Sequence, residues 1–206
     1  MRRIVLFSTP NENKNLEEIL NLIFPPEIKE KKVLFIPSQG LVNTPKKFID
    51  DWVDFSKTYN TTLELIDNAS ENVTNEIDKL MSANILIISG GDPFNLIFNL
   101  RRSGLDNAFK NFIIKEEFVL AGYSTGAYVL TPSLETAKIF NENHPGGIKY
   151  TSQNLFNDFK TLGIVNFEII AHYSKTSHKK IFSKYIKENE IEVKMIADDE
   201  YIVINY

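Results

Sequence analysis

The chain has 206 residues, of which 43% are hydrophobic and 24% are charged, and these values are ordinary for a soluble globular protein with one sizeable core. Its net charge of −4 gives no electrostatic support to a general nucleic-acid-binding role, and no apolar run is long enough to cross a membrane. The sequence contains no cysteine, which excludes disulfides, thiolate metal sites and cysteine nucleophiles and fits the cytoplasmic location that we expect.

Short apolar segments alternate with amphipathic helices along most of the chain. This alternation predicts a three-layer α/β fold, a doubly wound and mostly parallel sheet with helices on both faces, in a single domain covering residues 1–206. Strands are predicted at residues 3–8, 32–38, 62–67, 85–89 and 118–123, and helices at 13–24, 45–59, 74–81, 93–102, 105–115 and directly after Ser124. The later part predicts an elaborated loop region at 131–161, extended segments at 162–165 and 167–173, a helix at 176–188 and a closing hairpin of 192–197 with 201–205.

Three polar features follow predicted strands. They are the segment Gly90-Gly91-Asp92, the serine Ser124 and the histidine His172, which follows the apolar residues 167–171. Ligands of open α/β sheets bind at the carboxyl ends of the strands, so we expect these features to lie close together. The sequence therefore predicts one site at this edge of the sheet.

Ser124 stands in G-x-S-x-G spacing between a predicted strand and a predicted helix. In a nucleophile elbow, small neighbours such as Gly122 and Gly126 let the chain turn sharply and present the serine hydroxyl. The backbone N–H of Thr125 would then point to a developing oxyanion. The alternative is a serine that only caps the helix. The strand-to-helix context favours the nucleophile.

The segment SGGDP at residues 89–93 allows two interpretations. The N–H groups of Gly90 and Gly91 could supply the second donor of an oxyanion hole. Asp92 could instead cap the helix that begins at Pro93. The two interpretations are compatible, because a glycine can donate while the aspartate caps.

His172 is the best placed of the three histidines to take the serine proton, because His144 lies in an irregular loop and His178 opens a predicted helix. A carboxylate is needed to fix the tautomer of such a base. The acidic run at residues 198–200 offers candidates, although a solvated acidic turn is the alternative interpretation.

Four motifs resemble the peptidase E family of serine peptidases, which includes aspartyl dipeptidases and is related to cyanophycinase. They are GGDPF at 90–94, GYSTGA at 122–127, TLGIVNFEIIAHY at 161–173 and MIADDEYIVI at 195–204. The resemblance implies a class I glutamine amidotransferase-like fold without a cofactor or metal. It also implies Ser124 as nucleophile, His172 as general base and acid, Asp199 as the acid with Asp198 as the near alternative, and Gly91 and Thr125 as oxyanion donors.

The sequence departs from the family pattern at three positions. Thr125 replaces the usual alanine, Asp92 the usual asparagine and Ala171 the usual proline. In addition, all four arginines precede Ser124, and the lysines that follow it lack the bidentate fork of arginine. We therefore do not expect a preference for N-terminal aspartate.

The sequence predicts a cytoplasmic serine exopeptidase or dipeptidase that acts on short peptides through an acyl-enzyme, with a possible homo-oligomer and no nucleic-acid or membrane partner. Two alternatives stay open. One is an esterase of the α/β-hydrolase type, with Asp158 or Glu168 as the acid between serine and histidine. The other is a binding or regulatory protein with impaired catalysis, which Asp92 and Ala171 favour.

Overall fold

The structure is a computed structural model that describes residues 1–11, 13–70, 72–143 and 150–206. Its main sheet has the strand order β3-β2-β4-β5-β1-β8, in which β8 is antiparallel to β1 and the other neighbours are parallel. The strands are β1 Arg2–Phe7, β2 Val33–Ile36, β3 Leu63–Leu65, β4 Ile85–Ile88, β5 Phe118–Tyr123 and β8 Tyr201–Asn205. The mostly parallel α/β sheet predicted from the alternating pattern is confirmed.

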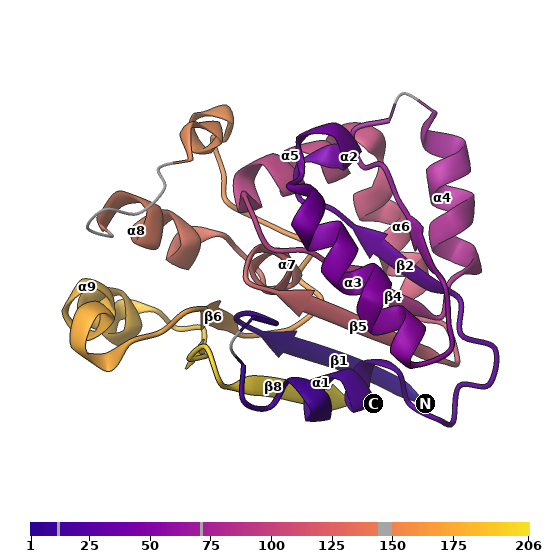
Figure 1. The fold of residues 1–206 in the computed structure, drawn as a ribbon. Helices are drawn as coiled ribbons and strands as arrows, with labels where there is room; N and C mark the ends of the chain where they lie inside the picture. The colour runs from indigo at the N-terminus through magenta and orange to yellow at the C-terminus, as the bar shows by residue number, and fades with distance from the viewer. Residues whose placement is uncertain (12, 71, 144–149) are drawn as a thin grey trace.

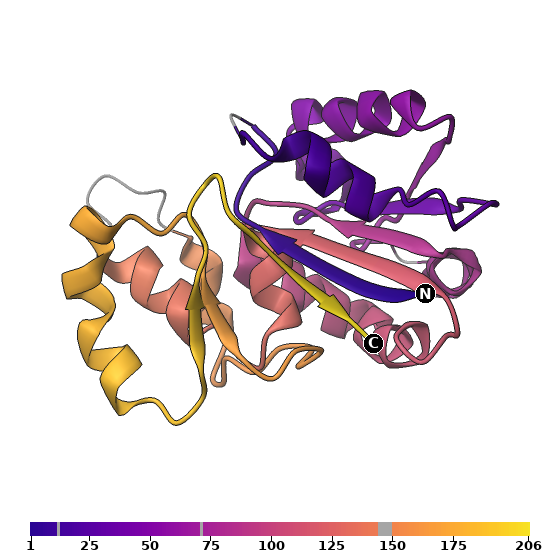
Figure 2. The same cartoon turned by 90° about the horizontal axis from the view of Figure 1, so that it is seen from below.

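The helices cover both faces of this sheet (Figures 1 and 2). They are α1 Leu16–Ile23, α2 Gly40–Asn43, α3 Lys46–Thr58, α4 Val73–Ser82, α5 Pro93–Ser103, α6 Leu105–Phe112, α7 Thr125–Leu130, α8 Glu135–Asn143 and α9 Lys175–Glu188, with a short 3-10 helix at Thr151–Leu155. Among the residues that the structure describes, no helix is long and apolar enough to span a bilayer.

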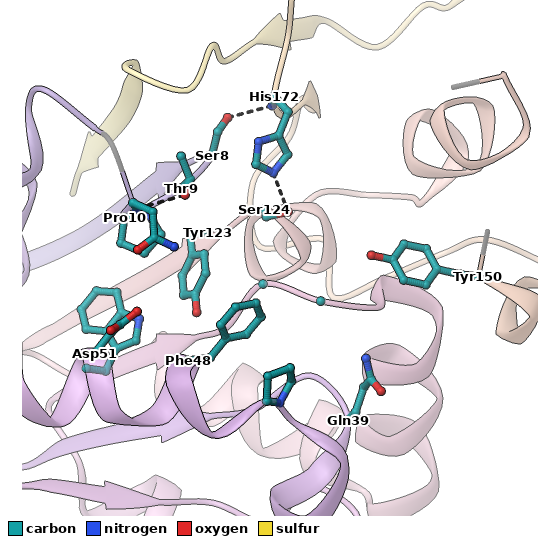
Figure 3. A pocket seen from close by; sticks show the side chains of 15 residues that line it. Ser8, Thr9, Pro10, Gln39, Phe48, Asp51, Tyr123, Ser124, Tyr150 and His172 are labelled. Carbon is teal, nitrogen blue, oxygen red and sulfur yellow. Dashed lines mark hydrogen bonds between the residues drawn. The ribbon is translucent and has the colours of Figure 1, made fainter. Parts of the chain in front are cut away.

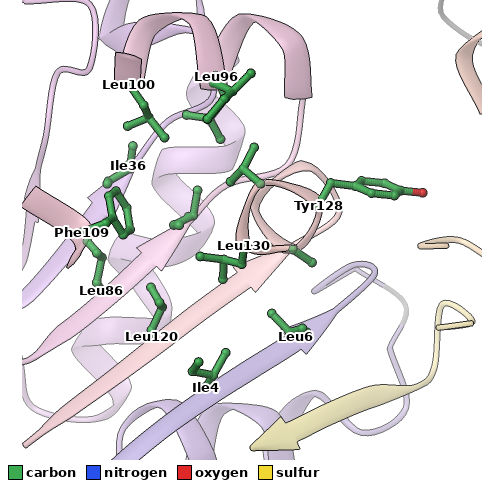
Figure 4. Packing of buried hydrophobic residues seen from close by; sticks show 14 of the residues in the cluster. Ile4, Leu6, Ile36, Leu86, Leu96, Leu100, Phe109, Leu120, Tyr128 and Leu130 are labelled. Atoms are coloured by element: carbon green, nitrogen blue, oxygen red, sulfur yellow. The ribbon is translucent and has the colours of Figure 1, made fainter. Parts of the chain in front are cut away.

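Alternating side chains of β1 divide the core into two layers. Val5 and Phe7 pack with helices α1 and α3 on one face, whereas Ile4 and Leu6 pack with α5, α6 and α7 on the other (Figure 4). All four side chains are almost completely buried. A strand that is buried on both faces of a sheet has a continuous run of apolar residues, which is why the segment RIVLF predicts a strand in the sequence.

The closing hairpin predicted from residues 192–205 is wrong. β7 (Val193–Met195) pairs in parallel with β6 (Glu168–Ile170) in a separate two-stranded sheet, while β8 pairs with β1 of the main sheet. The N–H and C=O groups of an unpaired strand edge can form hydrogen bonds with another strand. The chain after β7 crosses to the open edge of β1 and pairs there instead of pairing with β7. The acidic turn at 198–200 is thereby placed between the two sheets.

The region predicted as an elaborated loop contains helix α8 and the 3-10 helix, and residues 144–149, including His144, lie outside the described residues. The segment 162–165, predicted to be extended, forms no strand in the structure. Its N–H groups instead bond to the carbonyls that end α7, as Leu162 to Val129 at 3.1 Å and Ile164 to Leu130 at 2.9 Å. These bonds satisfy the helix terminus, so the segment needs no partner strand.

Candidate active site

Ser124 occupies a sharp turn between β5 and α7 with a positive φ of 48°. Positive φ is costly for a residue with a side chain, and the tight turn is possible because Gly122 and Gly126, two residues before and after Ser124, have no side chain. A Cβ on Gly126 would lie 2.2 Å from the Ile88 oxygen, and a Cβ on Gly122 would lie 2.6 Å from the backbone of Gly126. The serine side chain makes no capping hydrogen bond to α7, so the interpretation as a mere helix cap is not supported.

His172 links Ser124 to a carboxylate. Its Nε2 lies 3.0 Å from the Ser124 Oγ, and its Nδ1 lies 2.6 Å from the Oδ1 of Asp198 (Figure 3 shows the first of these contacts). A carboxylate on Nδ1 fixes the tautomer in which Nε2 is free to accept a proton from the hydroxyl. The geometry therefore gives a continuous hydrogen-bonded chain from serine to histidine to aspartate.

The carboxylate beside His172 is that of Asp198 and not that of Asp199, which the family pattern had favoured as the acid. The Asp199 carboxylate accepts a bond from Lys14 Nζ at 3.2 Å, and its backbone carbonyl accepts one from the Asn15 side chain at 2.8 Å. Adjacent residues in a turn point in different directions, and the sequence does not reveal which of two neighbouring aspartates faces the histidine. Asp198 was the near alternative.

The backbone of His172 is held by residues that carried no signal in the sequence. Its N–H donates to the Ser8 Oγ at 2.9 Å (Figure 3), and that hydroxyl donates to the Ile196 carbonyl at 2.8 Å. The preceding N–H, of Ala171, donates to the Tyr128 hydroxyl at 3.0 Å. Proline has no N–H, so the alanine at position 171 permits this bond, which the usual family residue could not make.

Gly91 and Thr125 lie beside Ser124, as expected from the sequence. Gly91 has a φ of +134°, and a Cβ there would lie 2.0 Å from the Ser38 Oγ, so this position requires glycine. The Thr125 hydroxyl donates to the Gly91 carbonyl at 2.5 Å and joins the two loops. Thr125 begins α7, and the N–H of a first helical residue has no carbonyl partner within its helix.

The carboxylate of Asp92 is occupied away from the serine. Its Oδ1 accepts the N–H groups of Phe94 at 2.9 Å and Asn95 at 3.1 Å, which caps α5, and its Oδ2 accepts the Ser152 hydroxyl. The cap expected at Asp92 is therefore confirmed. The N-terminus of α5 stabilises the negative charge of the Asp92 carboxylate. This interaction holds the carboxylate turned away from the serine.

Neither carboxylate of the esterase alternative contacts His172. Asp158 pairs with Arg101 at 3.3 Å, and the buried Glu168 accepts bonds from the Ser133 and Tyr185 hydroxyls at 2.5 and 2.6 Å. Burial and the Glu168 carboxylate raise the pKa of Tyr185, so the phenol stays a donor. These acids have other partners, which argues against that alternative.

Two cavities meet at Ser124. The larger, about 360 Å³, opens toward α3, and the smaller, about 170 Å³, opens toward α7 and α8. Both are lined by Gly91, Ser124, Tyr150 and His172. Within the described residues, no cluster of three or more histidine, cysteine, aspartate or glutamate side chains could hold a metal ion. The site can therefore accommodate groups on both sides of the serine.

The chain is similar to known proteins in both sequence and fold. The model of "Peptidase family S51" matches residues 4–206. The chain is 23% identical to "Uncharacterized peptidase PM1590" of Pasteurella multocida, covering 90% of this chain and 87% of the relative, and 22% identical to "Peptidase E" of Escherichia coli O6:K15:H31, covering 92% and 80%. Its fold is similar to that of a crystal structure from Listeria monocytogenes EGD-e, with a TM-score of 0.75 at 22% identity over 99% and 94% of the two chains. It is also similar to that of a peptidase from an acI-B1 Actinobacterium, with a TM-score of 0.70 at 17% identity over 100% and 84%.

Proposed function

Because the chain belongs to peptidase family S51, we propose that it is a serine exopeptidase or dipeptidase that hydrolyses short peptides through an acyl-enzyme. The observation that carries the proposal is the bonded series Ser124, His172 and Asp198, with distances of 3.0 and 2.6 Å between the successive pairs. Nucleophile, base and orienting acid in this order have the geometry that acyl transfer requires.

In the first half-reaction, His172 Nε2 takes the proton of the Ser124 hydroxyl while Oγ attacks the carbonyl carbon of the scissile peptide bond. Asp198 accepts a bond from Nδ1 and stabilises the imidazolium that forms. The carbonyl oxygen becomes an oxyanion, and the N–H groups of Gly91 and Thr125 bind it. Collapse of this intermediate breaks the C–N bond, and His172 gives its proton to the leaving amine.

In the second half-reaction, water replaces the amine. His172 takes a proton from the water as its oxygen attacks the acyl carbon, and a second oxyanion forms in the same place. When that intermediate collapses, the bond from Ser124 Oγ to the acyl carbon breaks and the serine regains its proton from His172. Every step uses side chains and backbone groups of this chain.

The preference for short peptides rests on the size of the cavities. Volumes of about 360 and 170 Å³ on the two sides of Ser124 are at and below the lower end of ligand pockets, so they suit individual residues more than an extended chain. A substrate with one residue on each side of the scissile bond fits this division.

The two departures that favoured an impaired binding protein have local structural roles. Asp92 caps α5, and Ala171 supplies an N–H to Tyr128. Both leave the contact between Ser124 and His172 in place. We therefore prefer a working peptidase to a vestigial one.

A fluorophosphonate probe tests the nucleophile, because an activated serine oxygen attacks its phosphorus, displaces fluoride and becomes phosphonylated. We expect the protein to be labelled, and we expect Ser124→Ala to remove both labelling and dipeptide hydrolysis, the latter by on the order of 10⁶-fold in kcat. Ser133→Ala, at a serine bonded to Glu168, is the matched control and should keep the label. Labelling that persists undiminished in Ser124→Ala would disprove the assignment, and no turnover of any dipeptide by a labelled protein would reject the peptidase.

A further inference from the structure

The larger cavity has a distinct electrostatic character. Among the described residues that line it, Asp51 is the only one with an aspartate, glutamate, lysine or arginine side chain. None of the described residues lining the smaller cavity has such a side chain. The two cavities therefore offer a substrate one carboxylate and no lysine or arginine from the described part of the chain.

Aromatic rings separate this carboxylate from the nucleophile. Tyr123, which directly precedes Ser124, lies 5.9 Å from Trp52 between ring centroids, and Phe48 completes the wall on α3 (Figure 3). In Figure 3, the rings of Tyr123 and Phe48 lie between Ser124 and Asp51. Trp52 and Tyr123 are almost completely buried, whereas Phe48 is half-buried, so a side chain that entered from the serine would pass mainly along Phe48 before it reached the carboxylate.

Asp51 is free enough to receive a ligand. Its Oδ2 accepts a bond from Lys47 at 2.6 Å, but Lys47 is on the solvent side, with 67% of its side chain exposed, against 24% for Asp51. A pair one helical turn apart whose lysine is mostly exposed contributes little and exchanges readily. Burial raises the pKa of Tyr123 to about 12, and the Asp51 carboxylate contributes in the same direction.

We propose that the larger cavity binds a lysine or arginine side chain next to the scissile bond, and that Asp51 binds the cationic group of that side chain. This proposal rests on the proposed function. The aliphatic stem of such a side chain packs along the rings, and its cationic head meets the carboxylate and the ring faces. An aspartate side chain in the same place would meet Asp51 as a like charge. The cavity therefore selects basic substrates and rejects acidic ones.

Norleucine gives the sharpest comparison, because it has the stem of lysine without the ammonium group. We would measure kcat/KM for Lys-Ala, norleucine-Ala and Asp-Ala, and for the reversed dipeptides. We expect lysine to exceed norleucine by about tenfold to a hundredfold in one of the two series, as for a hydrogen bond to a charged group, and aspartate to be poorest there. Asp51→Asn should remove the lysine advantage and leave norleucine unchanged.

The matched control is Asp50→Asn, since Asp50 forms the same kind of pair with Lys46 on α3 but does not line the cavity. It should leave all substrates unchanged. If Asp51→Asn lowers kcat/KM equally for the lysine and norleucine substrates, Asp51 does not bind the ammonium group, and the proposal is overturned. A wild-type preference for norleucine or aspartate over lysine in both series would do the same.

Binding separates this proposal from the proposed function. With Ser124→Ala, which cannot hydrolyse the dipeptides by the proposed route, calorimetry should give a Kd about tenfold or more lower for the favoured lysine dipeptide than for its norleucine counterpart. Adding Asp51→Asn should abolish the difference. If the wild type hydrolyses nothing but this difference is found, the peptidase fails and the cation site stands. If the peptides are hydrolysed but no difference is found, the cation site fails alone.

Discussion

Ser124 and His172 both adopt a positive φ, of 48° and 55°, and both are held in it from the end of β1. The N–H of Ser124 donates to the Phe7 carbonyl at 2.9 Å, and the N–H of His172 donates to the Ser8 hydroxyl at 2.9 Å. Two adjacent residues thus fix two strained residues that are 48 positions apart and share a hydrogen bond. Such strain persists only where the surrounding structure imposes it.

Ser8→Ala should therefore lower activity without touching the reacting atoms. The substitution leaves the N–H of His172 and the Ile196 carbonyl without their shared partner, at a cost of about 1–3 kcal/mol in the free energy of unfolding. We expect kcat for dipeptide hydrolysis to fall by about tenfold or more while KM changes little, because the loss concerns the position of the base.

The control for this variant is Ser56→Ala, at a buried serine whose hydroxyl bonds to Trp52 within α3. It should lower stability in urea denaturation with little effect on kcat. An unchanged kcat in Ser8→Ala, at a temperature where the variant is fully folded, would show that Ser8 does not position His172.

Asp198→Asn and Asp199→Asn form a matched pair that tests the identity of the acid. Asparagine at 198 can hold His172 in the wrong tautomer, so we expect kcat to fall by about 10⁴-fold. Asp199→Asn removes only a partly exposed pair with Lys14 and should change kcat less than about threefold. Steady-state kinetics on one dipeptide are sufficient, and the reverse ranking would return the acid to Asp199.

The sequence was informative about the site where a motif dictates backbone shape. Gly91, Gly122 and Gly126 are required by close approach or positive φ, so their spacing identified the loops around Ser124. The choice between Asp198 and Asp199 depends on where a turn points, which no local pattern encodes. Ser8 follows a strand as an ordinary polar residue, and its role arises only when β1 and β6 meet.

The same division explains the fold. Buried apolar runs and amphipathic helices are local signals, and they gave the strands β1 to β5 and most helices in the right order. The pairing of the last strands is not local. β7 and β8 are consecutive and separated by an acidic turn, which is the pattern of a hairpin, yet β6 and β1 offer the edges that they pair with.

Asp92 gives a test of whether a carboxylate beside the glycine loop lowers activity. Asparagine caps helices about as well as aspartate, so Asp92→Asn should preserve the N-terminus of α5 and change the stability by less than about 1 kcal/mol. Since the charge is turned to the helix, we expect kcat/KM to change less than about threefold.

Asp92→Ala removes the cap itself and leaves the Ser152 hydroxyl without its partner, and it should cost about 1–2 kcal/mol in urea denaturation. A large gain of activity in Asp92→Asn would contradict this account, because it would mean that the aspartate charge acts on the oxyanion despite its cap.

We expect the buried phenol of Tyr123 to make the folded protein less stable at high pH. Burial raises the pKa of its phenol from the ordinary 10 to about 12, so the folded protein holds this proton more tightly than the unfolded chain. The stabilisation is complete below pH 10 and falls as the pH rises toward 12, by about 3 kcal/mol in total for a shift of this size. Burial raises the pKa of Tyr128 in the same direction, so removing one phenol removes only part of the slope. We expect the free energy of unfolding, measured in urea between pH 9 and 12, to fall less steeply for Tyr123→Phe than for the wild type. An identical slope in the two proteins would mean that Tyr123 titrates alike in the folded and unfolded chains, and that the aromatic wall beside Ser124 is open to water.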